Sequence, residues 1–176
     1  MLEKSNTYKL LKVFMDFPTE SFRLRELSRL SKISPPSVMA YLREFEKQNL
    51  IQKKIKRRIP FYTALRDNYD FILYKKISIL FELNKSGLVD YLWDELSPEA
   101  VVLYGSFARG ESIEDSDIDL FILGKKTNTD INLDKFEKTL GKKIHFLSEE
   151  KLKNISVELR NNLLNGIILK GYIKVF

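Results

Sequence analysis

The chain has 176 residues, of which 44% are hydrophobic and 31% charged, with no cysteine and a formal net charge of +6. This length allows one domain or two small ones, and the lack of cysteine excludes disulfides and thiolate metal sites. No apolar run approaches the roughly 20 residues that span a bilayer, and the start, MLEKSNTYKL, lacks the apolar segment of a signal peptide. We therefore expect a cytoplasmic protein that does not enter a membrane.

The charge is distributed unevenly along the chain. Residues 1–66 hold 15 Lys and Arg against 6 Asp and Glu, a net charge of +9. Residues 67–176 hold 15 basic and 18 acidic residues, a net charge of −3. Such asymmetry suggests two parts with different roles, of which the basic part suits a polyanionic partner.

The basic part predicts three helices and a hairpin. Apolar residues at helical spacing predict helices over 5–15, 23–31 and 35–48. Strands are expected over 50–55 and 59–64. Ser34 is suited to cap the third helix, and Asn49 suits the left-handed position that follows its end. The turn between the strands is the basic run Lys56-Arg57-Arg58.

This layout, with the stretch LRELSRLSKISPPSVMAYLREFEKQNLIQKK, resembles the winged helix-turn-helix DNA-binding domains of bacterial and archaeal regulators over about residues 5–65. The resemblance implies a recognition helix in the major groove of double-stranded DNA and a hairpin wing on the phosphates. The expected DNA contacts are Ser37, Ala40, Tyr41, Arg43 and Lys47 of the helix, and Lys53, Lys54, Lys56, Arg57 and Arg58 of the wing. Alternatively, the domain docks a protein and the basic run is only solvated.

Residues 67–96 are helical in pattern and would connect the basic domain, residues 1–66, to the rest of the chain. The apolar side chains predicted to form one face are Phe71, Tyr74, Ile77, Leu80 and Phe81. Gly87 is expected to divide the segment into two helices. These helices could provide the interface of a homodimer.

From residue 97 onward strands and helices alternate, which predicts an α+β domain over 97–176. The expected strands are 101–104, 118–123, 143–147 and 167–169. The expected helices begin near residue 107, 133 and 155.

The chemistry of this second domain is predicted by Gly105-Ser106, which ends one strand, and by Asp117 and Asp119, which open the next. Two aspartates one residue apart on a strand point to the same side. A divalent cation commonly offsets the repulsion between them. Magnesium is often held by one or two carboxylates together with substrate phosphates, and Gly105 would let a phosphate approach the backbone.

The motif GSFARGESIEDSDID resembles the signature of polymerase-beta-like nucleotidyltransferases, and more closely that of the minimal nucleotidyltransferases of prokaryotes, over about residues 97–172. The resemblance implies a small mixed sheet, Mg²⁺ bound by Asp117 and Asp119, and a nucleoside triphosphate, most simply ATP, bound by Gly105 and Ser106. It also implies transfer of a nucleoside monophosphate to a hydroxyl. Arg109 either reaches the phosphates or is a solvated turn residue. Some minimal members modify a helical partner protein, which makes such a partner an expectation here.

One position departs from the family. A third carboxylate is expected on the strand GKKIHFLS, where this chain has His145, its single histidine. His145 could ligate metal or accept the proton itself, because a neutral imidazole can do both. Otherwise the site binds nucleotide without turnover, or Asp134 or Glu149 supplies the third carboxylate, or two aspartates suffice for slow catalysis.

These observations lead to three hypotheses. The first is a DNA-binding regulator of transcription whose nucleotidyltransferase-fold domain binds Mg-nucleotide and is catalytically degenerate. The second is an active nucleotidyltransferase, that is, a transferase whose acceptor is a hydroxyl group of a protein or of another molecule. The third is an interaction module with a vestigial site.

Overall fold

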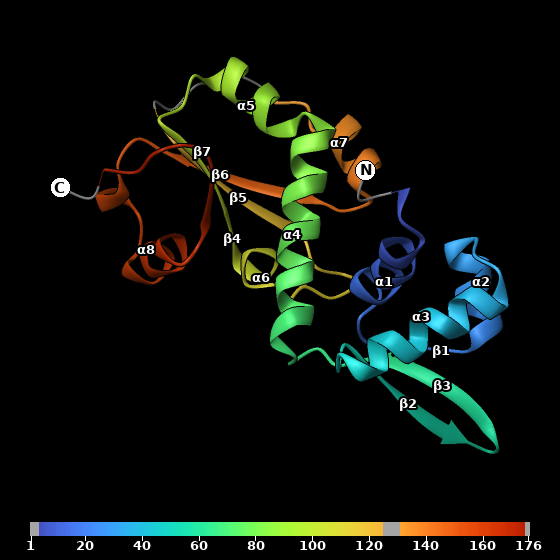
Figure 1. The fold of residues 1–176 in the computed structure, drawn as a ribbon. Helices are drawn as coiled ribbons and strands as arrows, with labels where there is room; N and C mark the ends of the chain where they lie inside the picture. Colours follow the sequence, from blue (N-terminus) through green and yellow to red (C-terminus); the bar gives the residue numbers. More distant parts are fainter. Residues whose placement is uncertain (1–3, 125–130, 175–176) are drawn as a thin grey trace. The chain divides into compact units, whose positions relative to one another are not determined.

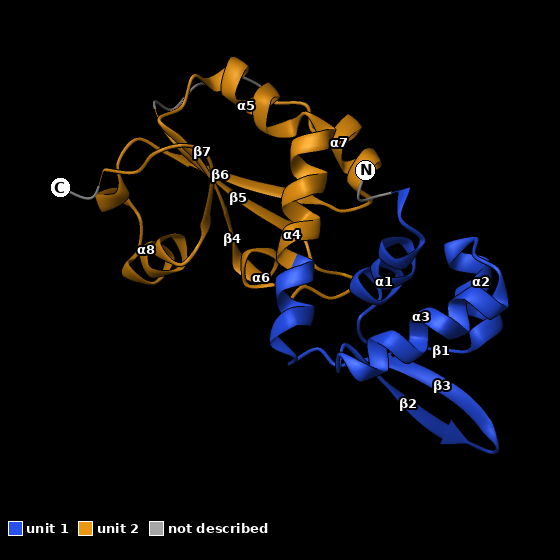
Figure 2. Cartoon of the chain, viewed as in Figure 1, with its two compact units in different colours: residues 1–75 blue, residues 76–176 orange. Residues whose placement is uncertain are grey.

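The computed structural model describes residues 4–124 and 131–174, and the chain divides into two compact units, Met1–Lys75 and Lys76–Phe176 (Figure 2). Within the described residues, no helix combines the length and the apolar character needed to cross a membrane.

Unit 1 contains three helices and a three-stranded antiparallel sheet (Figure 1). Its elements are α1 (Asn6–Asp16), β1 (Ser21–Phe22), α2 (Leu24–Ser31), α3 (Pro35–Lys47), β2 (Ile51–Lys56) and β3 (Ile59–Ala64). The sheet has the order β1-β3-β2. The three predicted helices and the hairpin are confirmed, whereas β1 was not predicted because two residues show no periodicity.

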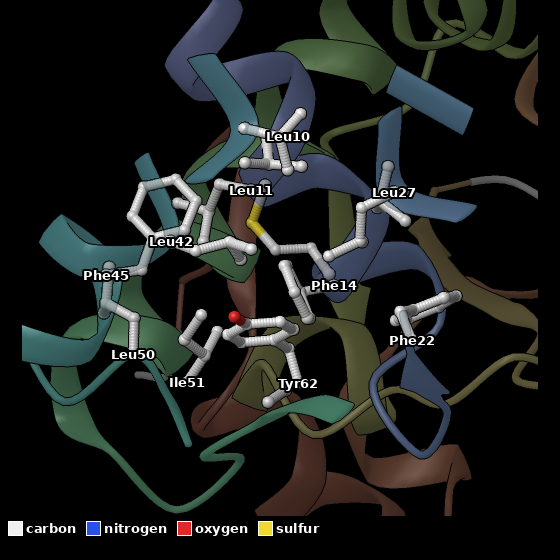
Figure 3. Packing of buried hydrophobic residues seen from close by; sticks show 14 of the residues in the cluster. Leu10, Leu11, Phe14, Phe22, Leu27, Leu42, Phe45, Leu50, Ile51 and Tyr62 are labelled. Carbon is white, nitrogen blue, oxygen red and sulfur yellow. The ribbon is translucent and has the colours of Figure 1, made fainter. Parts of the chain in front are cut away.

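The core of unit 1 joins the three helices to the hairpin (Figure 3). Val38, Leu42 and Phe45 of α3 are buried, as their spacing predicts. Tyr62 of β3 is only 1% exposed, and its hydroxyl lies 3.9 Å from Met39 Sδ. The sheet therefore closes the open side of the helical layer, and apolar burial of this kind is the main stabilising contribution in such a small unit.

The turns of unit 1 follow the sequence with one exception. Asn49 has the predicted left-handed backbone, with φ of 55°. Ser34 stands at the N-cap of α3, but its side chain does not cap the helix, because its hydroxyl donates to Ser37 Oγ at 3.0 Å. Arg57 and Arg58 both have positive φ, 50° and 63°, the backbone of a tight two-residue hairpin turn that Asn and Gly normally occupy.

The helix α4 (Tyr69–Ser86) spans the division between the units and contributes to both cores. Phe71 is buried in the core of unit 1, and Ile79 and Leu83 are buried in that of unit 2. The predicted apolar face was wrong: Tyr74, Ile77 and Phe81 are exposed by 37–44%. The prediction of a single apolar stripe fails because the buried positions of the helix recur every four residues, starting at Phe71. Gly87 ends the helix as predicted, with φ of 76°.

Unit 2 contains a four-stranded sheet with helices on both faces (Figure 1). After α4 its elements are α5 (Leu88–Leu96), β4 (Ala100–Tyr104), α6 (Gly105–Arg109), β5 (Ile118–Leu123), α7 (Asp134–Leu140), β6 (Ile144–Glu149), a 3-10 helix (Leu152–Asn154), α8 (Val157–Leu164) and β7 (Ile167–Gly171). The strand order is β6-β5-β4-β7, with β5 and β6 parallel and the other pairs antiparallel. The predicted mixed sheet is confirmed.

Alternate residues of the central strands enter two different cores, as expected for a sheet covered on both faces. Leu103, Ile118 and Leu120 pack in the cluster that contains α5 and Phe136 of α7. Val102 and Phe121 pack in the cluster that contains Leu163 of α8. Asp119 falls between buried positions of β5, so its side chain emerges on the α8 face at the end of the sheet where β5 begins.

Candidate functional site

Gly105 begins the short helix α6 directly after β4, and it lies against the carboxylate of Asp119. A Cβ added at Gly105 would overlap Asp119 Oδ2 and lie 3.3 Å from its Cγ. The backbone φ of 72° also falls in the left-handed region, which favours glycine. Both the close approach and the backbone therefore require glycine at this position.

Asp117 and Asp119 lie where β4 ends and β5 begins. Asp119 pairs with Tyr104 of β4 on one side and with His145 of β6 on the other. Burial raises the pKa of the Asp119 carboxyl above its ordinary value, and the nearby Asp117 raises it further, whereas His145 and Arg109 act in the opposite direction. The two carboxylates are thus close enough to repel each other, in a place where water screens them incompletely.

His145 completes this group from β6. Its Nε2 lies 3.8 Å from Asp117 Oδ2, and its side chain is 67% exposed. The parallel pairing of β5 and β6 puts His145 directly opposite Asp119, so both side chains lie on the same face of the sheet. The structure therefore places His145 beside the two aspartates, as the sequence predicted.

The other acids considered for this role lie elsewhere. Glu149 is opposite Leu123, four residues further along β6 than His145, and strand geometry separates such positions by about 13 Å. Asp134 begins α7, and its charge acts on Lys143. Among the described residues neither carboxylate forms a metal-holding group of three with Asp117 and Asp119, which corrects that alternative.

Residues 85–170 match the family model of the nucleotidyltransferase domain. This segment is a nucleotidyltransferase-family domain. Comparison with curated proteins and with solved structures gave no match. The match covers the whole site described above and does not test the helices and hairpin of unit 1.

Arg109 and Ser106 lie on α6 of the nucleotidyltransferase domain. Arg109 Nε donates to Glu111 Oε2 at 2.7 Å, and its side chain is 47% exposed. The guanidinium still lowers the pKa of Asp119, so it lies near the carboxylates while being held by Glu111. The carbonyl of Ser106 accepts the N–H of Glu111 at 2.9 Å, and that bond fixes the turn after α6.

Glu137 is a residue near the site that sequence reasoning missed. Its carboxylate accepts Lys143 Nζ at 2.6 Å and the backbone N–H of Ile144 at 3.0 Å. These hydrogen bonds, with smaller effects of the Lys143 and His145 charges, lower the pKa of Glu137. Glu137 therefore anchors the start of β6, one residue before His145. No local motif could have revealed it, because the contacts join α7 to Lys143 and Ile144, six and seven residues later, at the start of a strand.

The donor set limits how a metal could be held. Among the described residues, no group of three or more His, Cys, Asp or Glu side chains is arranged to hold a metal ion. Nucleotidyltransferase domains generally use a nucleoside triphosphate and a divalent metal. Two converging carboxylates fit Mg²⁺, which commonly takes one or two protein carboxylates and completes its shell with phosphate oxygens and water.

The predicted DNA contacts in unit 1 differ in exposure. Ala40, Arg43 and Lys47 of α3 are exposed, and so are all five predicted wing residues, Lys53, Lys54, Lys56, Arg57 and Arg58. Tyr41 is only partly exposed and packs against the core of unit 1, and Ser37 is partly buried beside Ser34. Ser37 and Tyr41, two of the predicted DNA contacts, are therefore less available than the spacing suggested.

The outer face of the hairpin also carries a cation that the sequence reasoning missed. The guanidinium of Arg23 lies 5.0 Å from the ring centre of Phe61, and Lys56 Nζ lies 5.8 Å from it. The ring of Phe61 thus contacts two cations at one surface of the sheet: Arg23, the residue before α2, and Lys56 of β2.

Proposed function

We propose that this protein is a DNA-binding regulator whose nucleotidyltransferase domain binds a magnesium nucleoside triphosphate. The observation that carries the proposal is the convergence of Gly105, Asp117, Asp119 and His145 at one end of the sheet. Within the segment that matches the family, this is where a glycine turn and two carboxylates meet.

Each side chain has a role in this proposal. Gly105 leaves room for a phosphate at the turn, and Ser106 offers its hydroxyl and N–H to phosphate oxygens. Asp117 and Asp119 would hold Mg²⁺, which neutralises phosphate charge and orients the triphosphate when bound. The repulsion between the two carboxylates favours binding of a cation, because the cation replaces like-charge contact with attraction.

The part of the proposal that concerns DNA binding by unit 1 rests on charge and backbone conformation. Unit 1 has the order of elements expected of a winged helix, with α3 as recognition helix and β2-β3 as wing. Arg57 and Arg58 occupy left-handed backbone, which costs non-glycine residues roughly 1 kcal/mol each. Two arginines at a turn that Asn-Gly would form more easily support a role for their charge, since such local strain often accompanies function.

Nucleotide binding is tested by isothermal titration of the full chain with ATP, and separately with GTP, CTP and UTP, in Mg²⁺. Asp117→Ala combined with Asp119→Ala is expected to abolish binding. The matched control is Asp115→Ala, which removes an exposed carboxylate of the same loop and should leave the affinity unchanged. Equal affinities in all three proteins would refute the proposed site.

DNA binding is tested by fluorescence anisotropy on duplex DNA over a range of salt. About five phosphate contacts predict a slope of log affinity against log salt near −4.5. Arg57→Ala with Arg58→Ala should weaken binding to all sequences alike, whereas Lys9→Ala with Arg29→Ala, cations outside α3 and the wing, should not. An unchanged affinity in the first variant would refute the wing as a DNA contact.

A second function, active nucleotidyl transfer, is favoured by the position of His145 beside both aspartates. In that reaction an acceptor hydroxyl oxygen bonds to the α-phosphorus, the bond from that phosphorus to the β-phosphate oxygen breaks, and pyrophosphate leaves. His145 Nε2 takes the hydroxyl proton. A helical partner protein is one candidate acceptor, and double-stranded DNA is another.

Replacing His145 distinguishes the two functions. With labelled ATP and pyrophosphate detection, His145→Ala abolishes transfer if the imidazole is the base. If the natural domain only binds nucleotide, it shows no transfer, and His145→Asp restores a third carboxylate and creates measurable transfer. Activity unchanged in both variants would exclude any part for His145.

A further inference from the structure

Phe61 of β3 lies on the face of the sheet that turns away from the core of unit 1. The next residue, Tyr62, is buried in that core and pairs with Phe22 of β1. Adjacent residues of a strand point to opposite faces. Phe61 is partly exposed and does not belong to the buried cluster of unit 1, so core packing does not explain an aromatic ring at this position.

Three cations surround the ring of Phe61. The guanidinium of Arg23 lies 5.0 Å from the ring centre, and Lys56 Nζ lies 5.8 Å from it. Lys54 stands directly opposite Phe61 on β2, and residues paired in this way share one face of the sheet. Arg23, Lys54 and Lys56 are all exposed, so this basic face is open to a partner.

No carboxylate balances these cations on the sheet. The strands β1, β2 and β3 contain no Asp or Glu. Among the described residues, neither Arg23 nor Lys56 forms a salt bridge. Glu26 accepts the backbone N–H of Arg23 at 3.4 Å and not its guanidinium. Because like charges on paired strands repel each other, this face favours an anionic partner from outside the sheet.

The ring also determines how Arg23 is presented to that partner. A planar guanidinium over an aromatic ring keeps N–H groups at its edge, where they can donate to two oxygens of one phosphate. The contact with Phe61 restricts the arginine side chain before binding, which lowers the entropy lost when a ligand orders it. Arg23 is therefore prepared for a phosphate, and Lys54 and Lys56 add point charges beside it.

We propose that Arg23, positioned by Phe61, contacts a backbone phosphate of duplex DNA. This inference rests on the proposed DNA binding by unit 1 and extends it to a residue outside both α3 and the wing. Phe61 lies three residues beyond Arg58 along β3, a separation of about 10 Å in strand geometry. Arg23 and the turn Arg57-Arg58 are thus set to meet different phosphates, and Lys56 lies between them.

The first test measures the binding of the full chain to duplex DNA by fluorescence anisotropy over a range of salt. Arg23→Ala removes one phosphate contact. It should weaken binding about fivefold to tenfold at about 0.1 M salt and reduce the magnitude of the log–log slope by about 0.9. The loss should be the same for all sequences, because a phosphate contact carries no sequence information.

Arg29→Ala is the matched control for this substitution. It removes another exposed arginine of unit 1, from the last turn of α2. Its affinity and salt slope should equal those of the natural protein. Arg23→Lys keeps the charge but not the planar fork, so it should keep the slope and lose part of the affinity.

The role of the ring is tested at Phe61 itself. Phe61→Leu keeps an apolar side chain and every charge, so the salt slope should stay the same while the affinity falls about twofold to fivefold. Phe61→Tyr keeps the ring and should bind like the natural protein. The double variant Arg23→Ala with Phe61→Leu should bind about as tightly as Arg23→Ala alone, because the ring acts through Arg23.

The outcomes separate this inference from DNA binding as such. If Arg57→Ala with Arg58→Ala weakens binding but Arg23→Ala behaves like Arg29→Ala, the Arg23 contact is overturned and DNA binding by the wing stands. If the natural chain does not bind duplex DNA at about 50 mM salt, both are overturned. Fully additive losses in the double variant overturn the positioning role of Phe61.

Discussion

The wing of unit 1 and the carboxylate site of unit 2 both gather like charges, but in opposite surroundings. The five Lys and Arg side chains of the wing are exposed, so water screens their mutual repulsion. Asp117 and Asp119 lie where a strand enters the sheet, and burial there raises the pKa of Asp119. The wing can hold its charges without a ligand at little cost, whereas the two carboxylates would be stabilised by the cation that the proposed function assigns to them.

The wing and the carboxylate site also differ in the reason for their backbone conformation. At the wing, two arginines adopt positive φ with side chains free in solvent. At the site, Gly105 also adopts positive φ, and in addition a carboxylate fills the place that a Cβ would take. Side-chain charge explains the first choice, and lack of space explains the second, so substitutions should affect the two regions differently.

The largest effect is expected from Gly105→Ala. The new Cβ would displace the Asp119 carboxylate and add the cost of positive φ, roughly 1 kcal/mol. We expect Mg-ATP affinity to fall more than about 100-fold and thermal stability to decrease. Titration calorimetry and thermal unfolding measure both quantities.

Gly87→Ala is the matched control for this substitution. Gly87 has a similar φ of 76°, but no heavy atom lies within 4 Å of an added Cβ. The Gly87→Ala variant should lose stability and keep its nucleotide affinity. Equal loss of affinity in both variants would mean that the contact with Asp119 is irrelevant to binding.

Asp119→Asn should separate stability from binding. Nucleotide affinity is expected to be lost, because the amide carries no charge to hold Mg²⁺. Since the pKa of Asp119 is raised, its charged form is disfavoured in the folded protein, and the neutral variant should unfold about 1–3 °C higher at pH 7. The difference should shrink below about pH 4, where the natural side chain is itself protonated.

The opposite result would change the interpretation of the site. If Asp119→Asn unfolds at lower temperature at pH 7, the carboxylate has a stabilising partner in the protein itself and the argument for a cation weakens. Differential scanning calorimetry from pH 3 to 8 distinguishes these outcomes.

Arg57→Asn with Arg58→Gly should separate stability from DNA binding at the wing. Asn-Gly suits the two-residue turn, so the unfolding temperature should rise. The salt slope of DNA binding should fall from near −4.5 to about −2.7, because two phosphate contacts are lost.

Arg57→Lys with Arg58→Lys is the control, because it keeps both charges and the strained turn. Its salt slope should match that of the natural protein. A slope that stays near −4.5 in the Asn-Gly variant would show that the turn does not touch phosphate.

The smallest effect is expected from Glu137→Gln. The lowered pKa of Glu137 means that its contribution to stability is present above the ordinary pKa of glutamate and is lost as pH falls through the folded value. The variant should unfold slightly below the natural protein at pH 7 and at the same temperature near pH 3. A large loss at pH 7 would imply that β6 depends on this anchor.

Much of this architecture was predictable because it follows from local chemistry. The boundaries of the predicted strands 59–64 and 118–123 match β3 and β5, since their apolar residues are bounded by turn residues. Asn49 and Gly87 take the left-handed backbone that their chemistry suggested. The spacing of Gly105 from Asp117 and Asp119 was enough to predict that they meet.

Only the tertiary structure decided which side chains surround the predicted elements and site residues. The apolar face of α4 was mispredicted because the helix serves two cores, and a periodic pattern assumes one. Tyr41 was predicted to contact DNA, yet it packs against the core of unit 1. Glu137 next to Ile144, and Arg23 over Phe61, join segments whose proximity no spacing encodes.

The sequence by itself determined the elements, the uneven charge and the pair of aspartates, because helix and strand periodicity and turn chemistry act over a few residues. The fold alone decided that β6 lies parallel to β5, which puts His145 opposite Asp119. Strand order and register depend on how distant apolar faces pack together, and that free energy belongs to the whole domain rather than to any one segment.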